Sequence, residues 1–140
     1  MNMTSARMAK LKNQKVNMLD RIFDITIDQV KGSYKDFELE KNQLDYPLEG
    51  VTYPVDYGFI RGYTGEDTHD LDVFVGKGDL QGAIVVYRPD IQAEWETKMY
   101  VRLSKLELLD VLKEFKPVLG SHTPMKKKFF LNFIRKFRAK

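Results

Sequence analysis

Short apolar runs rich in β-branched and aromatic residues, separated by glycine-containing turns, constrain this chain more than any other feature of its sequence. Runs of this length and composition are typical of β-strands. They follow one another too closely for βαβ units, so we expect a small barrel or a sandwich. The predicted strands are 22–27, 57–63, 71–75, 82–88 and 96–103.

The segments around the first strand are less regular. Residues 1–20 are polar and basic, and we interpret them as an N-terminal arm or helix. Residues 31–33 (Lys-Gly-Ser) mark a turn, and residues 34–50 are expected to form a loop or an irregular hairpin. The resulting assignment is one domain at 21–140, with a barrel at about 22–103 and helices at about 104–138.

The end of the sequence changes to a helical pattern. Ser104 and Glu107 have the spacing of a capping box, in which each side chain binds the backbone amide of the other residue. A second helix is predicted to begin at Thr123 and Pro124, since proline is favourable at the first helical position. Four apolar residues then recur at helical spacing, which favours packing against the strands over binding to a membrane surface. They are Phe130, Phe133, Ile134 and Phe137.

The composition excludes several classes of protein. The 140 residues argue for a single domain, and the absence of cysteine excludes disulfide scaffolds, thiolate metal sites and thiol nucleophiles. No run of about 18 apolar residues is present, so no membrane-spanning helix is expected. Residues 1–19 lack the apolar core of a secretory signal, and a cytoplasmic location is therefore expected.

The formal net charge of +3 conceals an uneven distribution of charge. Residues 1–16 carry four basic side chains and residues 126–140 carry seven, with no acid in either segment. Residues 17–125 hold the other 12 basic residues and all 20 acids, a net charge of −8. The acidic middle could collect metal ions, and the basic ends could pair with it or hold a polyanion.

Five titratable residues crowd the segment 66–72, where a turn leads into an apolar strand. Asp70 and Asp72 are expected on one face of that strand, because side chains alternate along it. Carboxylates this close repel one another unless cations lie between them, and hard divalent ions such as Mg²⁺ prefer oxygen ligands. The alternative is a solvated acidic turn. The five residues are Glu66, Asp67, His69, Asp70 and Asp72.

A second polar set lies on the last predicted strand. Glu94, Glu96 and Lys98 alternate along the chain, so they are expected to share a face. Asp90 precedes them in a turn, and their face could meet the one that carries Asp72. Carboxylates for metal ions and a lysine for phosphate are the groups that phosphoryl transfer requires. The alternative is an exposed strand face with a local Glu–Lys pair.

Together these segments resemble the soluble inorganic pyrophosphatases of family I. Residues 53–60 (Tyr-Pro-Val-Asp-Tyr-Gly-Phe-Ile) are similar to the family's Tyr-Pro-x-Asn-Tyr-Gly-aromatic-Ile segment. Residues 67–73 (Asp-Thr-His-Asp-Leu-Asp-Val) are similar to its Asp-Gly-Asp-Pro-apolar-Asp-apolar segment, at the family's spacing from Tyr57. Residues 96–98 (Glu-Thr-Lys) resemble a later Asp-x-Lys element. The resemblance covers roughly residues 22–103.

This resemblance implies a small OB-like β-barrel with flanking helices and a hydrolytic function. The implied reaction is the hydrolysis of inorganic diphosphate to two phosphates by a metal-activated water, with Mg²⁺, Mn²⁺ or another divalent ion as the cofactor. The implied metal ligands are Asp67, Asp72, Glu96, Asp90 and Asp28. The implied phosphate-binding residues are Tyr57, Lys98 and Lys35.

Three departures from the family's pattern bear on the mechanism. The family uses the middle acid of its Asp motif to activate the attacking water, and His69 stands there in this chain. Asp70 replaces the usual proline, and no arginine lies between residues 22 and 60 to match the family's early phosphate-binding arginine. A neutral imidazole can accept a proton, so His69 or Asp70 is expected to be the catalytic base. Alternatively, the substitution has removed the activity.

Two other functions fit the same sequence. The missing arginine and the altered Asp motif would suit a nucleotide or another phosphoanhydride as the substrate. A catalytically weakened OB-like binding module for nucleic acid or a partner protein is a further hypothesis, although the acidic middle of the chain repels phosphates. The expected partners are inorganic diphosphate and further copies of the chain in a homo-oligomer, and no membrane partner is expected.

Overall fold

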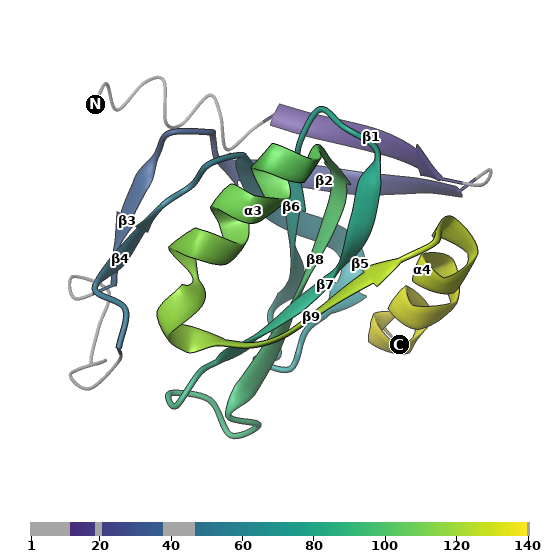
Figure 1. Cartoon of the computed structure of the whole chain (residues 1–140). Coiled ribbons are helices and arrows are strands. Elements are labelled where there is room, and N and C mark those ends of the chain that lie inside the picture. Colours follow the sequence, from purple (N-terminus) through teal and green to yellow (C-terminus); the bar gives the residue numbers. More distant parts are fainter. Residues whose placement is uncertain (1–11, 19–20, 38–46, 140) are drawn as a thin grey trace.

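The computed structural model describes residues 12–18, 21–37 and 47–139, and Figure 1 shows their arrangement. These residues form nine strands, two α-helices and two short 3₁₀ turns. The strands are β1 (Lys12–Met18), β2 (Arg21–Gln29), β3 (Tyr34–Asp36), β4 (Gly50–Thr52), β5 (Asp56–Thr64), β6 (Asp70–Val75), β7 (Leu80–Tyr87), β8 (Trp95–Leu103) and β9 (Leu119–Met125). The helices are α3 (Lys105–Glu114) and α4 (Lys127–Ile134), and the 3₁₀ turns are η1 (Lys116–Val118) and η2 (Arg135–Phe137).

Seven of the strands form one sheet, in the order β1-β2-β5-β6-β8-β7-β9. Its neighbouring strands are antiparallel except β6 and β8, which run parallel. The five predicted strands correspond to β2, β5, β6, β7 and β8, so the mainly-β prediction is confirmed. The strands β1 and β9 stand at the two ends of the sheet and do not pair with each other in the described residues. Closure into the predicted OB-like barrel is therefore not confirmed.

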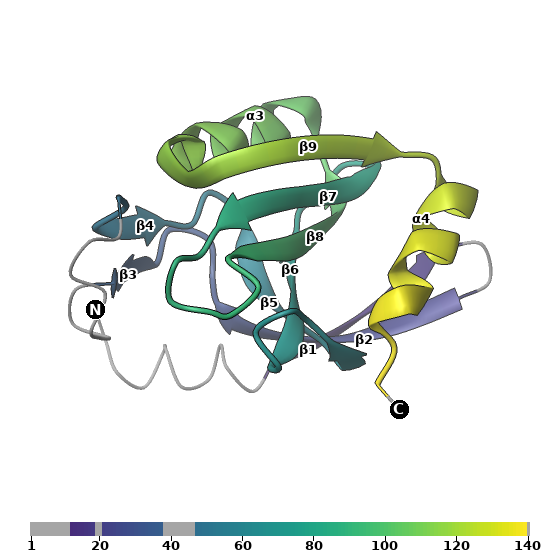
Figure 2. The ribbon, with the colours of Figure 1, turned by 90° about the horizontal axis from the view of Figure 1, so that it is seen from below.

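A separate two-stranded sheet forms in the region predicted to be a loop or an irregular hairpin. The strands β3 and β4 pair antiparallel, and residues 38–46 between them lie outside the described residues. The predicted turn at 31–33 is confirmed, with Gly32 at a φ of 90°, which glycine adopts without steric cost. Figures 1 and 2 show this hairpin on the opposite side of the molecule from α4.

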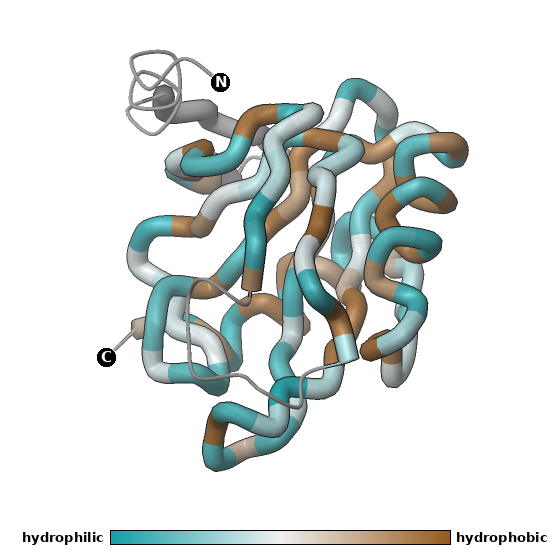
Figure 3. The backbone as a smooth tube through the Cα atoms, turned by 90° about the vertical axis from the view of Figure 1, so that its left-hand side faces the viewer, coloured by the Kyte–Doolittle hydropathy of each residue, from teal (hydrophilic) through white to brown (hydrophobic). Residues whose placement is uncertain are grey.

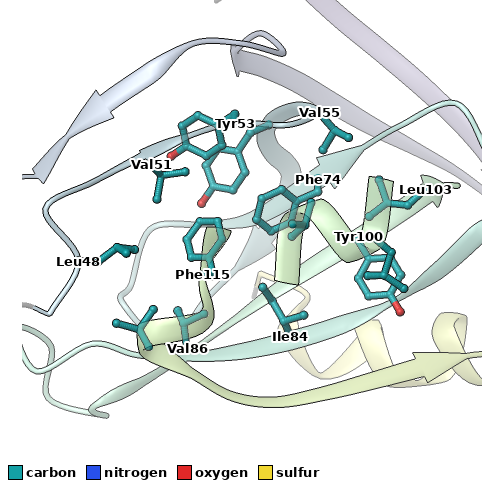
Figure 4. Close-up of a cluster of buried hydrophobic side chains, with 14 residues drawn as sticks. Leu48, Val51, Tyr53, Val55, Phe74, Ile84, Val86, Tyr100, Leu103 and Phe115 are labelled. Atoms are coloured by element: carbon teal, nitrogen blue, oxygen red, sulfur yellow. The ribbon is translucent and has the colours of Figure 1, made fainter. Parts of the chain in front are cut away.

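The main sheet buries apolar side chains on both faces, because successive strand residues point to opposite sides. Val73 belongs to one buried cluster, which Phe130 of α4 helps to cover. The next residue, Phe74, belongs to the second cluster, which includes Val111 of α3 and is drawn in Figure 4. Figure 3 shows how apolar positions recur between polar ones along the trace. The two helices thus pack against different clusters of the same sheet.

The N-terminal prediction is wrong for residues 12–18, which form a strand. This strand, β1, pairs with β2 from Lys12 opposite Ile27 to Met18 opposite Arg21. Residues 1–11 and 19–20 lie outside the described residues. In the described residues β1 pairs only with β2, and an edge strand tolerates polar and charged residues in its sequence, which obscure a strand pattern.

The C-terminal helices are confirmed in part. The predicted capping box begins α3: the Glu107 amide donates to Ser104 Oγ at 3.1 Å, and the Ser104 amide donates to Glu107 Oε1 at 2.7 Å. The second helix begins at Lys127 and not at Thr123 and Pro124, which belong to β9. Because β9 is an edge strand, the missing N–H of a proline is tolerated there.

The predicted apolar stripe of α4 packs onto the sheet, as expected. Phe130 and Ile134 are buried, and Phe133 and Phe137 pack against the same cluster. Core packing, and not exposure to a membrane surface, is therefore the role of this stripe. Among the described helices, none is long and apolar enough to cross a membrane.

Phe130 and Phe129 are neighbours on α4 but differ in burial, since Phe130 is 0% and Phe129 is 51% exposed. We expect Phe130→Ala to lower the free energy of unfolding by about 3–5 kcal/mol, because it leaves a cavity in the core. Phe129→Ala is the matched control and should cost less than about 1 kcal/mol. Urea denaturation followed by circular dichroism measures both values, and equal losses would contradict this packing.

A second prediction concerns His122 on β9, whose Nε2 lies 2.7 Å from the Tyr100 hydroxyl. Burial raises the pKa of Tyr100 to about 12 and lowers the pKa of His122 below its ordinary value. The unfolded chain therefore binds a proton at His122 more readily than the folded chain does. Stability should consequently fall as the pH drops below about 6.5.

The variant His122→Gln removes the titrating group while keeping a polar side chain on β9. Its free energy of unfolding should fall less than that of the wild type between about pH 7.5 and about pH 5. Chemical denaturation at a series of pH values gives both slopes. Identical slopes would show that His122 makes no such contribution.

Candidate active site

A polar pocket of about 410 Å³ is bounded by residues of β2, β3, β5, β6 and β8. Eight of the ten site residues predicted from the sequence line it. They are Asp28, Lys35, Tyr57, Asp67, His69, Asp70, Asp72 and Lys98. The other two, Glu96 and Asp90, contact Arg88, which is part of the lining. The fold therefore gathers residues from five strands and one turn around a single space.

The strand register brings the central residues together. The strands β6 and β8 run parallel with Val73 opposite Met99, so the preceding residues, Asp72 and Lys98, lie side by side. The predicted meeting of the Lys98 face with Asp72 is confirmed by their contact. Asp70 and Asp72 both line the pocket, as expected from their shared face of β6.

Lys98 is the centre of the hydrogen-bonded network in this pocket. Its ammonium lies 2.9 Å from Asp72 Oδ2 and 3.2 Å from Glu96 Oε1. It also donates to the Tyr57 hydroxyl at 2.5 Å, and that hydroxyl donates to Asp72 Oδ2 at 2.5 Å. Lys98 is 6% and Glu96 2% exposed, so these charges meet where little water can screen them.

Burial and these contacts shift the acidities of the network. Burial and the neighbouring Asp72 carboxylate raise the pKa of Tyr57 well above that of an ordinary phenol. Burial opposes the charge on Lys98, but Asp72 and Glu96 outweigh it and raise the pKa of Lys98. Burial also raises the pKa of Asp72, although Lys98 acts in the opposite direction. At neutral pH, Tyr57 is therefore a hydrogen-bond donor and Lys98 a cation.

Arg88, directly after β7, is a site residue that none of the sequence motifs identifies. Its guanidinium donates to both carboxylate oxygens of Asp90, at 2.8 and 2.7 Å, and to Glu96 Oε1 at 2.6 Å. The hydrogen bonds with Asp90 contribute most to raising the pKa of Arg88. The phosphate-binding arginine of the resembled family is expected between residues 22 and 60, whereas Arg88 reaches the site through the pairing of β7 with β8. One signal was available, because Arg88 ends a predicted strand two residues before Asp90.

Two acids of the predicted clusters, Glu66 and Glu94, do not line the pocket. Glu66 accepts hydrogen bonds from the Thr97 amide at 2.9 Å and from the Thr97 hydroxyl at 2.6 Å. These bonds tie the turn before β6 to β8. Glu94 is exposed, precedes β8 and has a φ of 65°, so the predicted alternation with Lys98 does not extend to it.

The carboxylates have the donor chemistry of a site for a hard divalent cation. In the described part of the chain, however, no three histidine or acidic residues gather closely enough to hold a single ion. The Lys98 ammonium joins Asp72 to Glu96. The Arg88 guanidinium joins Glu96 to Asp90. A metal ion shared by these acids would take the place of one of these cationic side chains.

Carboxylates, a phenol and cationic side chains around one pocket are typical of enzymes that act on phosphate groups. Part of the chain is 40% identical, over 58 residues, to a protein of Streptomyces coelicolor named inorganic pyrophosphatase. The alignment takes in 38% of this chain and 36% of that relative, so the chain spans little more than a third of the relative's length. No family model matches the chain, and no solved structure matches it. The partial similarity agrees with the resemblance carried by the motifs.

Replacing Lys98 should show how strongly the stability of the network depends on the charge of the Lys98 ammonium. We expect Lys98→Met to lower the free energy of unfolding by about 3–5 kcal/mol, because it leaves buried acids without their shared cation. Lys105→Met, at an exposed position on α3, is the control and should change this value by less than about 0.5 kcal/mol. Urea denaturation at neutral pH measures both. If the two variants were equally stable, Lys98 would not be the shared cation of this site.

Proposed function

We propose that the chain is a hydrolase that cleaves inorganic diphosphate into two phosphates with the help of divalent metal ions. The observation that carries this proposal is the gathering of eight predicted residues around one pocket. The partial similarity to an inorganic pyrophosphatase supports the same reaction. Mg²⁺ is the proposed cofactor, with Mn²⁺ or another divalent ion as an alternative. An OB-like barrel, a homo-oligomer and a cytoplasmic location remain predictions within this proposal.

Tyr57 and Lys98 are proposed to hold oxygens of the substrate. Their polar atoms are 2.5 Å apart and both residues line the pocket, so one phosphate oxygen can contact both. Lys35 adds a second ammonium to the lining, and Arg88 adds a guanidinium that can bind two phosphate oxygens at once. Together these donors would stabilise the charge that develops on the leaving phosphate.

Asp67, Asp72 and Glu96 are proposed to hold the metal, with Asp90 and Asp28 as further ligands. When bound, divalent ions would neutralise charge on the diphosphate and make an attacking water more acidic. For one ion to be shared, Asp72, Glu96 and Asp90 must exchange their contacts with Lys98 and Arg88. Asp67 and Asp28 must approach them, since no three of these acids are grouped in the described residues. The released cations could then bind phosphate oxygens, so that charge in the pocket stays compensated throughout.

His69 and Asp70 are proposed to take the proton of the attacking water. Both residues are exposed and both line the pocket. The Asp67 carboxylate accepts a hydrogen bond from the His69 amide at 3.0 Å, which orders the turn that carries both. In the reaction, the water oxygen bonds to phosphorus, the bridging P–O bond breaks, and the water proton passes to the His69 ring or to the Asp70 carboxylate.

Phosphate release from inorganic diphosphate, with Mg²⁺ or Mn²⁺ present, is the direct test. The wild type should release phosphate, and Asp72→Asn should be slower by at least about 100-fold, because it removes a carboxylate proposed to hold the metal that stabilises the transition state. Asp110→Asn, at an exposed position on α3, carries the same chemical change and should keep the wild-type rate. A folded wild type that releases no phosphate with any divalent ion would refute the proposal.

Thermal melting of the same proteins reports metal binding without turnover. Mg²⁺ should raise the melting temperature of the wild type and of Asp110→Asn, because a ligand of the native state stabilises it. The shift should be smaller for Asp72→Asn. A shift of equal size in Asp72→Asn would place the metal away from this carboxylate.

The variant His69→Asp restores the residue type that the resembled family carries at this position. If His69 only weakens an inherited site, His69→Asp should release phosphate faster than the wild type. Both an imidazole and a carboxylate can accept the water proton, so the two rates are compared under the same metal conditions. A slower rate would instead make the imidazole the base of this chain.

A nucleotide or another phosphoanhydride is a second candidate substrate, favoured by the aromatic part of the pocket. Phe37, Phe59 and Phe115 line it beside the polar groups, and aromatic side chains can stack on a base. Nucleoside triphosphates in the same phosphate-release assay separate the two candidates. Faster release from a nucleotide than from diphosphate would identify it as the preferred substrate.

A further inference from the structure

A second pocket, of about 580 Å³, lies on α4 and its flanking residues, apart from the candidate active site. We call its lining the basic face, and it consists of Lys126, Lys128, Phe129, Leu131, Asn132 and Arg135. None of these residues lines the candidate active site. Figures 1 and 2 place α4 on the opposite side of the molecule from the β3–β4 hairpin, which contributes to that site.

The basic face belongs to a packed element. Phe130 of α4 is fully buried in the core, and the chain after η2 forms a β-bridge between Arg138 and Tyr63. The Phe133 ring packs against the core and lies 6.4 Å from the Phe129 ring, measured between centroids. The fold therefore sets the backbone positions of the basic residues relative to Phe129 before any partner binds.

Among the described residues, no ion pair balances the positive charge of this face. Residues 126–140 carry seven basic side chains and no acid. Lys126, Lys128 and Arg135 are exposed, and the ion pairs of the described residues do not involve them. A concentrated field of one sign on a fixed surface attracts a polyanion and repels a second copy of itself.

We propose that the basic face binds single-stranded nucleic acid. Lys126, Lys128 and Arg135 would contact phosphates of the strand. Phe129, whose side chain is 51% exposed among these cations, would stack on a base. The Asn132 amide offers both a donor and an acceptor to the edge of that base. In a flexible single strand, phosphates and bases follow one another along the chain. Cations around an exposed ring can therefore contact the phosphates while the ring stacks on a base.

An anionic membrane surface would be attracted by the same charges, but the apolar side chains argue against it. An interfacial helix needs a continuous apolar stripe to bury in the bilayer. On α4 that stripe is already used, since Phe130 and Ile134 are buried against the sheet. Leu131 is half-buried, which leaves Phe129 as the one mostly exposed apolar side chain of the basic face. Stacking on a base requires only one such ring.

Binding is tested by fluorescence anisotropy with labelled oligothymidine and oligouridine of about 20 nucleotides, long enough for a stacking and phosphate-binding surface. EDTA is present, so the carboxylates of the candidate active site repel the strand. The wild type should bind both oligonucleotides in low salt. If three cations contact phosphates, the association constant should fall by about two decades for each tenfold rise in salt.

Two variants of the basic face should weaken this binding. The charge reversal Lys128→Glu/Arg135→Glu should reduce affinity at least about tenfold, because it replaces two phosphate contacts by repulsion. Phe129→Ala should reduce affinity by about 5-fold to 150-fold through the loss of stacking. The matched control Lys105→Glu/Lys113→Glu makes the same change of charge at exposed positions on α3 and should stay within about threefold of the wild type.

The outcomes separate this surface from the alternatives. No binding by the wild type in low salt, unchanged binding by the two variants, or an equal loss in the α3 control would each overturn the proposal. Sedimentation with phosphatidylserine vesicles is measured in parallel, and vesicle binding without oligonucleotide binding would assign the face to a membrane. Because Phe129 is an exposed residue, Phe129→Ala tests the proposal even if the charge reversal unfolds.

Diphosphate hydrolysis by the charge-reversal variant is measured alongside. It should equal the hydrolysis by the wild type, because the basic face shares no residue with the candidate active site. Loss of oligonucleotide binding with unchanged hydrolysis supports two separate sites. If the wild type binds oligonucleotides but hydrolyses no diphosphate, the proposed enzymatic function fails and the binding surface stands.

Discussion

The Lys98 ammonium is the interaction on which the rest of this structure depends. It lies 2.9 Å from Asp72, 3.2 Å from Glu96 and 2.5 Å from the Tyr57 hydroxyl, so a single side chain connects β5, β6 and β8. A lysine that is only 6% exposed is costly without anionic partners, and two acids this close repel each other without a cation. Each of these buried groups is therefore tolerated only because the others are present.

This network also explains how a charged pocket can adjoin an apolar core. The Tyr57 ring packs in the core, with its centroid 4.5 Å from that of Tyr53 and 4.8 Å from that of Phe74. Its hydroxyl meanwhile donates to Asp72 at the pocket. An aromatic side chain with one polar atom can face both environments at once. The pocket wall is thus part of the core, which holds the polar groups of the pocket in position.

Acidic and basic residues are separated in space as well as in the sequence, although the net charge of the chain is small. Acids gather around the pocket, where Lys98 and Arg88 neutralise some of them. The basic face on α4 has no such compensation from ion pairs of the described residues. A small, metal-binding phosphate compound and a polyanionic strand would therefore meet different surfaces. That separation allows the two proposed activities to exist in one chain without competition for the same groups.

The sequence by itself determined the features that depend on residues close to one another in the chain. These are the five strands from 22–27 to 96–103, the α3 capping box, and the shared face of Asp70 and Asp72. Only the tertiary structure decided which distant segments meet. Parallel pairing of β6 with β8 places Asp72 beside Lys98, and the β7–β8 pair brings in Arg88. Residues 12–18 and 119–125 are strands because β2 and β7 pair with them, and the periodicity of a segment does not record which strand it will pair with.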